Sequence, residues 1–398
     1  MRHNFKYTIF ASYNAYLTQA LVINFTPLLY VTFQTELGLT LSQISLLIAV
    51  NFGTQMLTDL CSSPIVERIG HRAAVVLAHI FCSVGMIGLY IFPAILQNDF
   101  IAIMIPTIIC GVGGGLIEVM VSPIMEACPT EHKSAQMSLL HSFYCWGQAG
   151  VVLVSTILFA IFGLDKWPLF ACLWAIIPMC DIFLFLFVPI NDLVEDGEGE
   201  TCRQLLSRPA FWAMMGLMIC SGAAEITMAQ WASGFAEAGL GVPKAMGDLL
   251  GPCLFALLMG AARILSAVLS RRISLYTLMG GSCVLCILSY LIAVFAPHPV
   301  IALLGCGLCG LSVGALWPGI FSVAAEHIPL GGFPMFAILA FCGDVGCTTG
   351  PTLAGQIADA CGGDLKAAFL FALLFPLCAL CLLIALGRSK KHKRGDDV

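Results

Sequence analysis

Charged side chains are scarce in this sequence of 398 residues. Only 10% of the residues are Asp, Glu, Lys or Arg, whereas 59% are hydrophobic. The mean hydropathy is +0.95, and a soluble domain would carry about 25% charged residues. So little charge excludes a chain whose main solvent is water, and we expect a membrane protein.

Motifs of catalysis and nucleotide binding are also missing. The sequence has no HExxH, GxGD or GxSG motif, and the glycines at 111 and 113–115 lie in an apolar run without a following Lys-Ser or Lys-Thr. Small residues that let helices approach explain these glycines better than a nucleotide loop does. We therefore expect no enzyme and no cofactor, with an intramembrane enzyme kept as a remote alternative.

The 19 cysteines do not indicate a disulfide framework or a metal site. Their number is odd, and nearly all lie inside apolar stretches, where cysteine acts as a small packing residue. Three CxxC pairs occur, but no His or carboxylate lies beside them in their apolar runs. We expect no bound metal.

Long apolar stretches dominate the chain. A membrane-spanning helix needs about 20 mostly apolar residues, and these stretches lack the alternation of outer-membrane strands. Since every backbone polar group must be paired inside hydrocarbon, the predicted fold is an all-α integral membrane protein. We count twelve spans, at about 8–33, 41–63, 73–93, 101–126, 134–162, 168–189, 209–235, 246–269, 274–296, 299–325, 333–358 and 366–387.

The longest polar break divides these spans into two sets of six. Residue pairs separated by 200 positions, such as Gly114 with Gly314 and Glu126 with Glu326, indicate a duplicated unit. Parallel repeats around a central linker are typical of transporters. We predict an N-terminal six-helix bundle at 1–189, a cytoplasmic linker at 190–208, a C-terminal six-helix bundle at 209–387 and a basic cytoplasmic tail at 388–398.

The positions of Lys and Arg predict the orientation. With a cytoplasmic N-terminus, fourteen of the 18 Lys and Arg residues lie on the cytoplasmic side, three lie on the opposite side and Arg263 lies within a span. This satisfies the positive-inside rule. We expect a multi-pass protein of the cell (plasma or inner) membrane with both termini in the cytoplasm, in contact with lipid and not with nucleic acid.

The segment that follows the second span resembles a known signature loop. Residues 63–72, SPIVERIGHR, are similar to the loop of the major facilitator superfamily, with Ser63 in place of its first glycine and Glu67 in place of its usual Asp. The resemblance implies two six-helix bundles and alternating access. It also implies gating roles for the loop and its surroundings, which here are Asp59, Glu67, Arg68, Gly70 and Arg72, with Arg263 as a partner for an acid or a further gating residue.

Further motifs, in order along the chain, resemble the fucose permease-like branch of that superfamily. They are GGGLIE at 113–118 with Ser-Pro at 122–123, LHSF at 140–143, GAAE at 222–225, WPG at 317–319 and GDVG at 343–346. This resemblance implies a sugar:proton symporter. The first span departs from the branch because it offers Asn14, Gln19 and Asn24 but no acidic residue, which leaves sodium open as the coupling ion.

Carboxylates inside the spans are the candidates for ion coupling. A charged side chain at the bilayer centre costs about 2.5–3.5 kcal/mol on insertion scales and is by default a functional candidate. We rank Glu118 first and Glu225 second. A protonated structural acid is the alternative for Glu118. Close helix packing is the expected role of Asp344, and Asp181 has no predicted role.

Polar and aromatic residues near these acids are the candidates for substrate binding. Asn51, Gln55 and Asp59 recur every fourth residue and so form one helical stripe. A Trp beside polar groups can stack on a sugar ring while its neighbours bind the hydroxyls. An interfacial Trp is the alternative for Trp231, and a structural role is the alternative for His141. The predicted binding set is Asn24, Asn51, Gln55, His141, Trp146, Gln148, Gln230, Trp231 and Trp317.

Together these features predict a secondary active transporter for a small polar solute such as a sugar, coupled to protons and working in the uptake direction. An exporter of drugs or metabolites, in which the acids bind cationic substrates, is the alternative.

Overall fold

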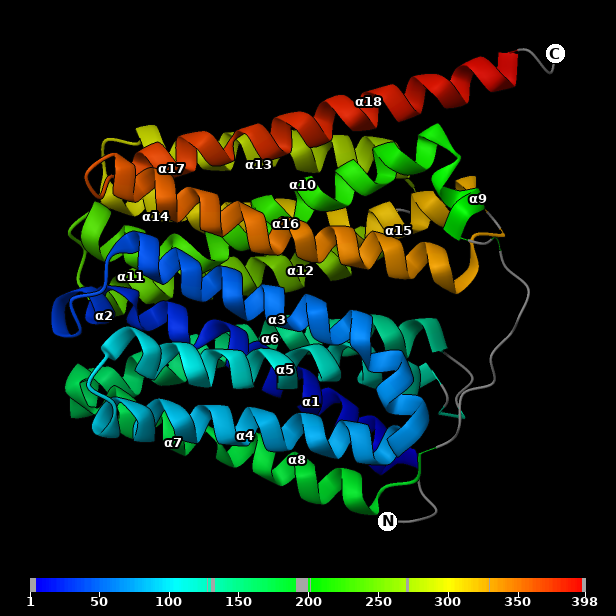
Figure 1. The fold of residues 1–398 in the computed structure, drawn as a ribbon. Helices are drawn as coiled ribbons and strands as arrows, with labels where there is room; N and C mark the ends of the chain where they lie inside the picture. Colours follow the sequence, from blue (N-terminus) through cyan, green and yellow to red (C-terminus); the bar gives the residue numbers. More distant parts are fainter. Residues whose placement is uncertain are drawn as a thin grey trace. The chain divides into compact units, whose positions relative to one another are not determined.

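The chain forms helices throughout the part that the computed structural model describes (Figure 1). The described residues are 5–126, 128–129, 133–190, 200, 202–269, 272–328 and 330–395. Most of the predicted linker, 191–199 and 201, and the end of the tail, 396–398, lie outside them. The all-α prediction is confirmed in the described ranges.

The chain divides into two compact units. Unit 1 comprises residues 1–195 together with 243–249, and unit 2 comprises residues 196–242 and 250–398. The helices of unit 1 are α1 (Phe5–Asn24), α2 (Tyr30–Glu36), α3 (Leu41–Ile69), α4 (His71–Ile95), α5 (Asp99–Glu126), α6 (Lys133–Phe162), α7 (Trp167–Trp174), α8 (Ile176–Phe187) and α11 (Lys244–Asp248). Those of unit 2 are α9 (Cys202–Leu206), α10 (Pro209–Gly234), α12 (Leu254–Leu269), α13 (Leu275–Phe295), α14 (Pro299–Val313), α15 (Leu316–His327), α16 (Gly332–Ala360), α17 (Leu365–Ala372) and α18 (Leu374–Gly395).

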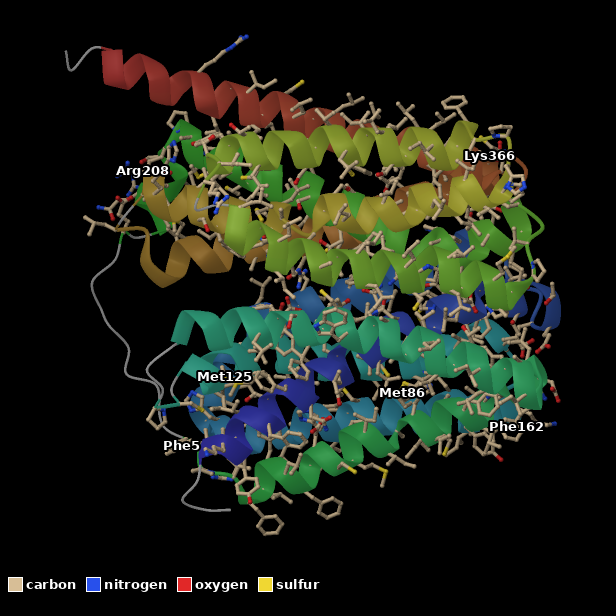
Figure 2. All side chains as sticks on the ribbon, turned by 180° about the vertical axis from the view of Figure 1, so that it is seen from behind. Phe5, Met86, Met125, Phe162, Arg208 and Lys366 are labelled. Carbon is tan, nitrogen blue, oxygen red and sulfur yellow. The ribbon has the colours of Figure 1, made fainter. Side chains whose placement is uncertain are left out.

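Eleven helical segments of the described chain are long and apolar enough to cross a membrane. Several contain two or more helices, such as Phe5–Glu36 with α1 and α2 and Leu164–Phe187 with α7 and α8. The remaining predicted span, 333–358, corresponds to α16, which has 29 residues. These segments carry large exposed apolar side chains, such as Phe162 of α6, which is 60% exposed and labelled in Figure 2. Extensive exposed apolar surface is expected where hydrocarbon is the solvent.

Prolines account for three breaks inside the spans. Proline has no N–H, so the carbonyl four residues earlier loses its helical hydrogen bond. Pro178, Pro318 and Pro376 remove the donors for Trp174, Gly314 and Ala372. At these points α7 gives way to α8, α14 to α15 and α17 to α18.

Residues 243–249 join unit 1 through polar contacts. The Lys244 ammonium donates to the Leu28 carbonyl and lies 3.3 Å from Asp248 Oδ2. Thr156 of α6 donates to the same carboxylate oxygen over 3.3 Å. These contacts hold α11 against α6.

Glycines allow the central helices of unit 1 to touch. A Cβ at Gly111 or Gly115 of α5 would come within 2.9 Å or 2.8 Å of a backbone carbonyl of α3, and a Cβ at Gly113 within 2.7 Å of the Ala78 carbonyl on α4. The expectation that these glycines serve helix packing is confirmed. As a result, α5 lies in close contact with both neighbours.

Unit 2 contains the same kind of contact between α10 and α16, which gives a stability prediction. A Cβ at Gly346 would overlap the Ile219 carbonyl oxygen, whereas one at Gly281 of α13 has nothing within 4 Å. We expect Gly346→Ala to destabilise the purified protein by about 1–3 kcal/mol because α10 must move away. Gly281→Ala, the matched control, should leave stability unchanged or raise it by up to about 1 kcal/mol. Thermal melting in detergent measures both, and equal melting temperatures for the two variants would contradict the close packing.

Candidate functional site

Glu118 lies on α5 in unit 1 and is held by a neutral side chain. Gln19 of α1 donates from Nε2 to Glu118 Oε2 over 2.9 Å. The carboxyl is half-buried. Within the described side chains, no ion pair reaches Glu118. A carboxyl with only an amide partner carries no compensating positive charge.

The polar stripe of α3 packs against the same face of α5. Gln55 contacts α5 at Gly114, one helical turn before Glu118, since a Cβ at Gly114 would lie 3.1 Å from Gln55 Oε1. Asn51 and Gln55 are 9% and 3% exposed. In the described part of the unit, Asn51 Oδ1, Gln55 Nε2 and Gln19 Oε1 form no hydrogen bond. Buried polar atoms of this kind are uncommon and call for a ligand, water or alternative state.

The signature loop follows at the end of α3. Gly70 has φ = 82°, a value that favours glycine, and it separates α3 from α4 by a single residue. Arg72 donates from Nη1 to the carbonyls of Phe185 and Leu186, over 2.6 Å and 3.1 Å, at the end of α8. Cations are favoured there by the helix dipole. Arg68 is exposed, and the Glu67 side chain lies outside the described set.

The other candidates of unit 1 lie on several helices. Asp59 approaches α5 at Gly115, where a Cβ would lie 3.0 Å from Asp59 Oδ1. Asn24 donates to the Ala20 carbonyl over 2.9 Å and to the Tyr144 hydroxyl over 3.4 Å.

The candidates on α6 differ in their exposure. Gln148 is buried, whereas Trp146 is 40% exposed. His141 is exposed and lies edge-on to Tyr16 with ring centroids 5.3 Å apart. A shared binding surface of these three side chains stays a prediction.

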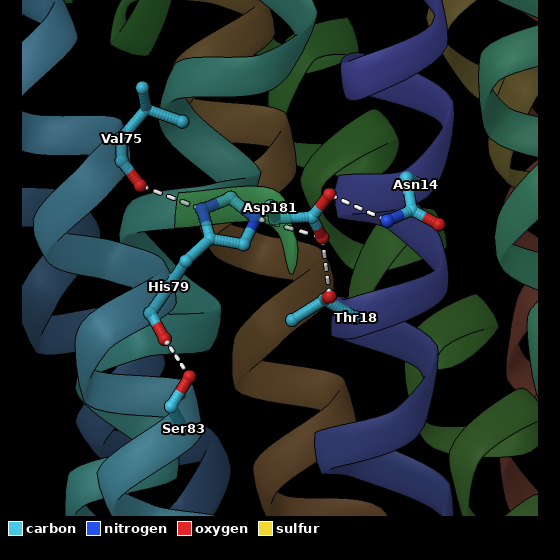
Figure 3. A network of polar contacts seen from close by, with 6 residues as sticks. All are labelled: Asn14, Thr18, Val75, His79, Ser83 and Asp181. Atoms are coloured by element: carbon cyan, nitrogen blue, oxygen red, sulfur yellow. Dashed lines mark hydrogen bonds and ion pairs between the residues drawn. The ribbon is translucent and has the colours of Figure 1, made fainter. Parts of the chain in front are cut away.

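A second polar cluster of unit 1 was missed at the level of sequence (Figure 3). Asp181 of α8 accepts from Asn14 Nδ2 over 2.6 Å and from Thr18 Oγ1 over 2.8 Å, both on α1. His79 of α4 places Nε2 3.5 Å from Asp181 Oδ2. The four residues come from three helices, and only Asn14 and Thr18, four residues apart on α1, share a helical spacing. Only the apolar context of His79 and Asp181 could have drawn attention to the cluster.

The candidates of unit 2 centre on Glu225 of α10. Arg263 of α12 lies 4.0 Å from Glu225 Oε1, while Glu225 Oε2 has no hydrogen bond among the described residues. Tyr290 of α13 donates to the neighbouring Ala224 carbonyl over 2.8 Å. Glu225 thus has a cation at the limit of ion pairing, unlike Glu118.

The tryptophans of unit 2 have different surroundings. Trp231 is 1% exposed and donates from Nε1 to the Pro351 carbonyl of α16 over 2.9 Å, a packing contact inside the unit, and neighbouring Gln230 is also buried. Trp317 is half-buried and its ring lies on Gly343, where a Cβ would overlap it. The contact at Gly343 accounts for the small residue beside Asp344. Sugar stacking by Trp231 and Trp317 stays a prediction.

No metal site is found in the described chain. No group of three His, Cys, Asp or Glu side chains there is arranged to hold a metal ion. Burial raises the pKa of the Cys128 thiol, beyond the fourth span, to about 11. It is therefore protonated and unreactive at neutral pH.

The arrangement defines a class of protein. Helical spans with exposed apolar surfaces enclose carboxyl and amide groups in each compact unit, and such intramembrane groups mark solute and ion pathways. This is a multi-pass membrane transporter.

Comparison with known proteins gives the family. The model of the Major Facilitator Superfamily matches residues 9–332, and the chain belongs to this superfamily of secondary transporters. It is 26% identical over 334 residues to the membrane protein MosC of Rhizobium meliloti, covering 80% of this chain and 77% of MosC.

Two solved transporters share the fold. A bacterial homologue of the human lysosomal transporter Spinster, described as inward-facing and occupied, matches with a TM-score of 0.77 and 13% identity over 98% of both chains. The superfamily transporter FucP, in the outward conformation, matches with a TM-score of 0.61 and 15% identity over 96% of this chain and 98% of FucP. The fold is common to both, and membership of the fucose permease-like branch stays a prediction.

The contacts of Arg72 give a test of the loop. Replacing Arg72 by Gln removes two hydrogen bonds to the end of α8, and hydrogen bonds from charged groups contribute roughly 1.5–3 kcal/mol. We expect Arg72→Gln to lower the melting temperature of the purified protein, while Arg68→Gln, an exposed arginine of the same loop, changes it little. Equal effects of the two substitutions would show that the α4–α8 contact is not stabilising.

Proposed function

We propose that this transporter couples the uptake of a small polar solute such as a sugar to proton entry, with Glu118 as the group that binds the transported proton. The observation that carries the proposal is the pairing of a half-buried carboxyl with a neutral amide. A fixed cation in that place would hold the carboxyl permanently ionised. Gln19 is neutral, so the carboxyl can bind and release a proton.

The Gln19 amide can serve both protonation states of Glu118. Its NH₂ group donates to the carboxylate, as in the structure. Its Oε1, which has no partner in the described chain, can accept from the protonated carboxyl after rotation of the amide. Proton gain and loss then leave neither state without a hydrogen bond.

We infer the solute class from the amides of α3, the helix that packs against α5. Asn51 and Gln55 offer an acceptor and a donor that are buried and not used by the described protein. An uncharged solute with several hydroxyl groups can bind to both, and Glu118 has no cationic partner among the described side chains of unit 1, which disfavours an anionic solute. A sugar fits this chemistry.

The proposed mechanism is alternating access. The bundles at 1–189 and 209–387 expose the bound solute to one side of the membrane and then to the other. The protein lies in the cell membrane, and both termini lie in the cytoplasm. Gating is assigned to Asp59, Glu67, Arg68, Gly70, Arg72 and Arg263. Glu225 is a second proton-binding candidate.

A binding screen tests the solute class. We expect a subset of neutral sugars to raise the melting temperature of the purified protein, since a ligand bound at 100 times its dissociation constant adds about 2.7 kcal/mol. Gln55→Leu should abolish the shift without unfolding the protein. Stabilisation by lipophilic cations instead of sugars would favour export of drugs or metabolites.

Proteoliposomes with an imposed pH gradient test the coupling role of Glu118. With a sugar identified by the screen, the wild-type protein should accumulate it about tenfold for each pH unit if one proton enters with each solute, because one unit corresponds to 1.36 kcal/mol. Glu118→Gln should let the solute equilibrate without accumulation. Glu36→Gln, at an exposed glutamate, is the matched control, and accumulation by Glu118→Gln at the wild-type level would refute this assignment.

A further inference from the structure

The contacts of His79 fix the position of one ring proton. His79 Nδ1 lies 2.7 Å from the Val75 carbonyl oxygen. A carbonyl oxygen only accepts hydrogen bonds, so Nδ1 must carry a hydrogen. In a neutral imidazole Nε2 then has a lone pair and no hydrogen. This lone pair points at Asp181 Oδ2, 3.5 Å away (Figure 3).

Two lone pairs facing each other in a dry interior repel. His79 and Asp181 are both 0% exposed, and no other polar atom of the described chain lies within hydrogen-bond distance of Nε2. Asn14 and Thr18 already donate to the two oxygens of Asp181 and add no charge. An ionised Asp181 beside a neutral His79 would therefore be an uncompensated charge buried in hydrocarbon, which is strongly unfavourable.

We propose that His79 and Asp181 form a proton-binding site separate from Glu118, with one proton held between His79 Nε2 and Asp181 Oδ2. The proton makes the pair neutral as a whole, whether it is written as imidazolium with carboxylate or as imidazole with carboxylic acid. It also converts the repulsive contact into a hydrogen bond.

Other ionisable groups around the pair do not replace this proton. Cys82 of α4 and Cys110 of α5 are buried thiols on the neighbouring helices, and neither supplies a positive charge. Arg72 faces the end of α8 and Glu118 faces Gln19. The other ionisable side chains that the structure describes on the helices packed against the pair lie at helix ends, are exposed or face other partners. They are Lys6, Tyr7, Tyr13, Tyr16, Asp59, Cys61, Arg68, His71, Tyr90, Asp99, His141, Tyr144, Cys145, Cys172 and Cys180.

The position of the site gives it a link to Glu118. Thr18, which donates to Asp181, and Gln19, which donates to Glu118, are neighbours on α1. Loss of the proton would strengthen the hydrogen bonds that Asn14 and Thr18 of α1 donate to Asp181. A shift of α1 would then alter the position of Gln19. This link rests on the proposed function of Glu118, whereas the proton site does not.

Nitrogen magnetic resonance of the full-length protein, labelled with ¹⁵N-histidine and reconstituted in lipid nanodiscs, tests the site. The His79 signals are assigned by their loss in His79→Gln, and His71→Gln, on the same helix, should leave them in place. At neutral pH we expect the Nε2 signal of His79 to be displaced towards that of a hydrogen-bearing ring nitrogen. In Asp181→Asn, where the amide donates its own hydrogen to Nε2, the ring should be neutral and the displacement lost.

The wild-type spectrum tests the proton site by itself, even if Asp181→Asn fails to fold. A His79 Nε2 signal of an ordinary neutral ring nitrogen without hydrogen, at neutral pH, would overturn the proton site. The result is independent of transport, because no solute is needed. Failure of the Glu118 assignment in proteoliposomes would leave the His79–Asp181 site standing, and the reverse also holds.

Discussion

The cost of burying a carboxyl group in an apolar bundle is the constraint on which the organisation of unit 1 depends. An isolated charge there costs several kcal/mol, so each carboxyl requires partners or a proton. In this unit α1 supplies the partners for two of them. Asn14 and Thr18 bind Asp181, and Gln19 binds Glu118. All three are neutral, and we propose that the proton is the variable charge at both places.

Close packing brings these groups together. The glycines of α5 allow the backbone of α3 to approach on one side and that of α4 on the other. Gln55 reaches α5 one turn from Glu118 as a result, and the cysteine Cys82 on α4 lies against Gly113. The glycine-rich apolar stretch of α5 therefore lets polar side chains of the neighbouring helices come close to α5. The same principle operates in unit 2, where Gly346 and Gly350 let α16 contact α10 beside Glu225.

The fold was more accessible to sequence reasoning than the contacts. A membrane span can be predicted locally, because about twenty consecutive apolar residues indicate a helix in hydrocarbon whatever the rest of the chain contains. Glu118 was also accessible, since a single acid in an apolar run is visible by itself. The partner of Glu118 was not, because Gln19 lies 99 residues away. The His79–Asp181 cluster was missed for the same reason, because His79 and Asp181 lie on α4 and α8, far apart in the sequence from each other and from their partners on α1. For Trp231 the sequence predicts a binding role, whereas the structure shows a packing contact. Its neighbours in sequence indicate a binding surface, but within unit 2 its indole is packed against α16, a contact that depends on a helix 120 residues away.

The most direct test of the central claim, that a neutral environment makes the proton the variable charge at Glu118, is the external pH of a lightly buffered suspension of proteoliposomes. No pH gradient is imposed, and a sugar that binds the protein is added outside. Proton entry with the solute predicts a transient rise of the external pH when wild-type protein is present. Solute entry without any change of external pH would contradict the account.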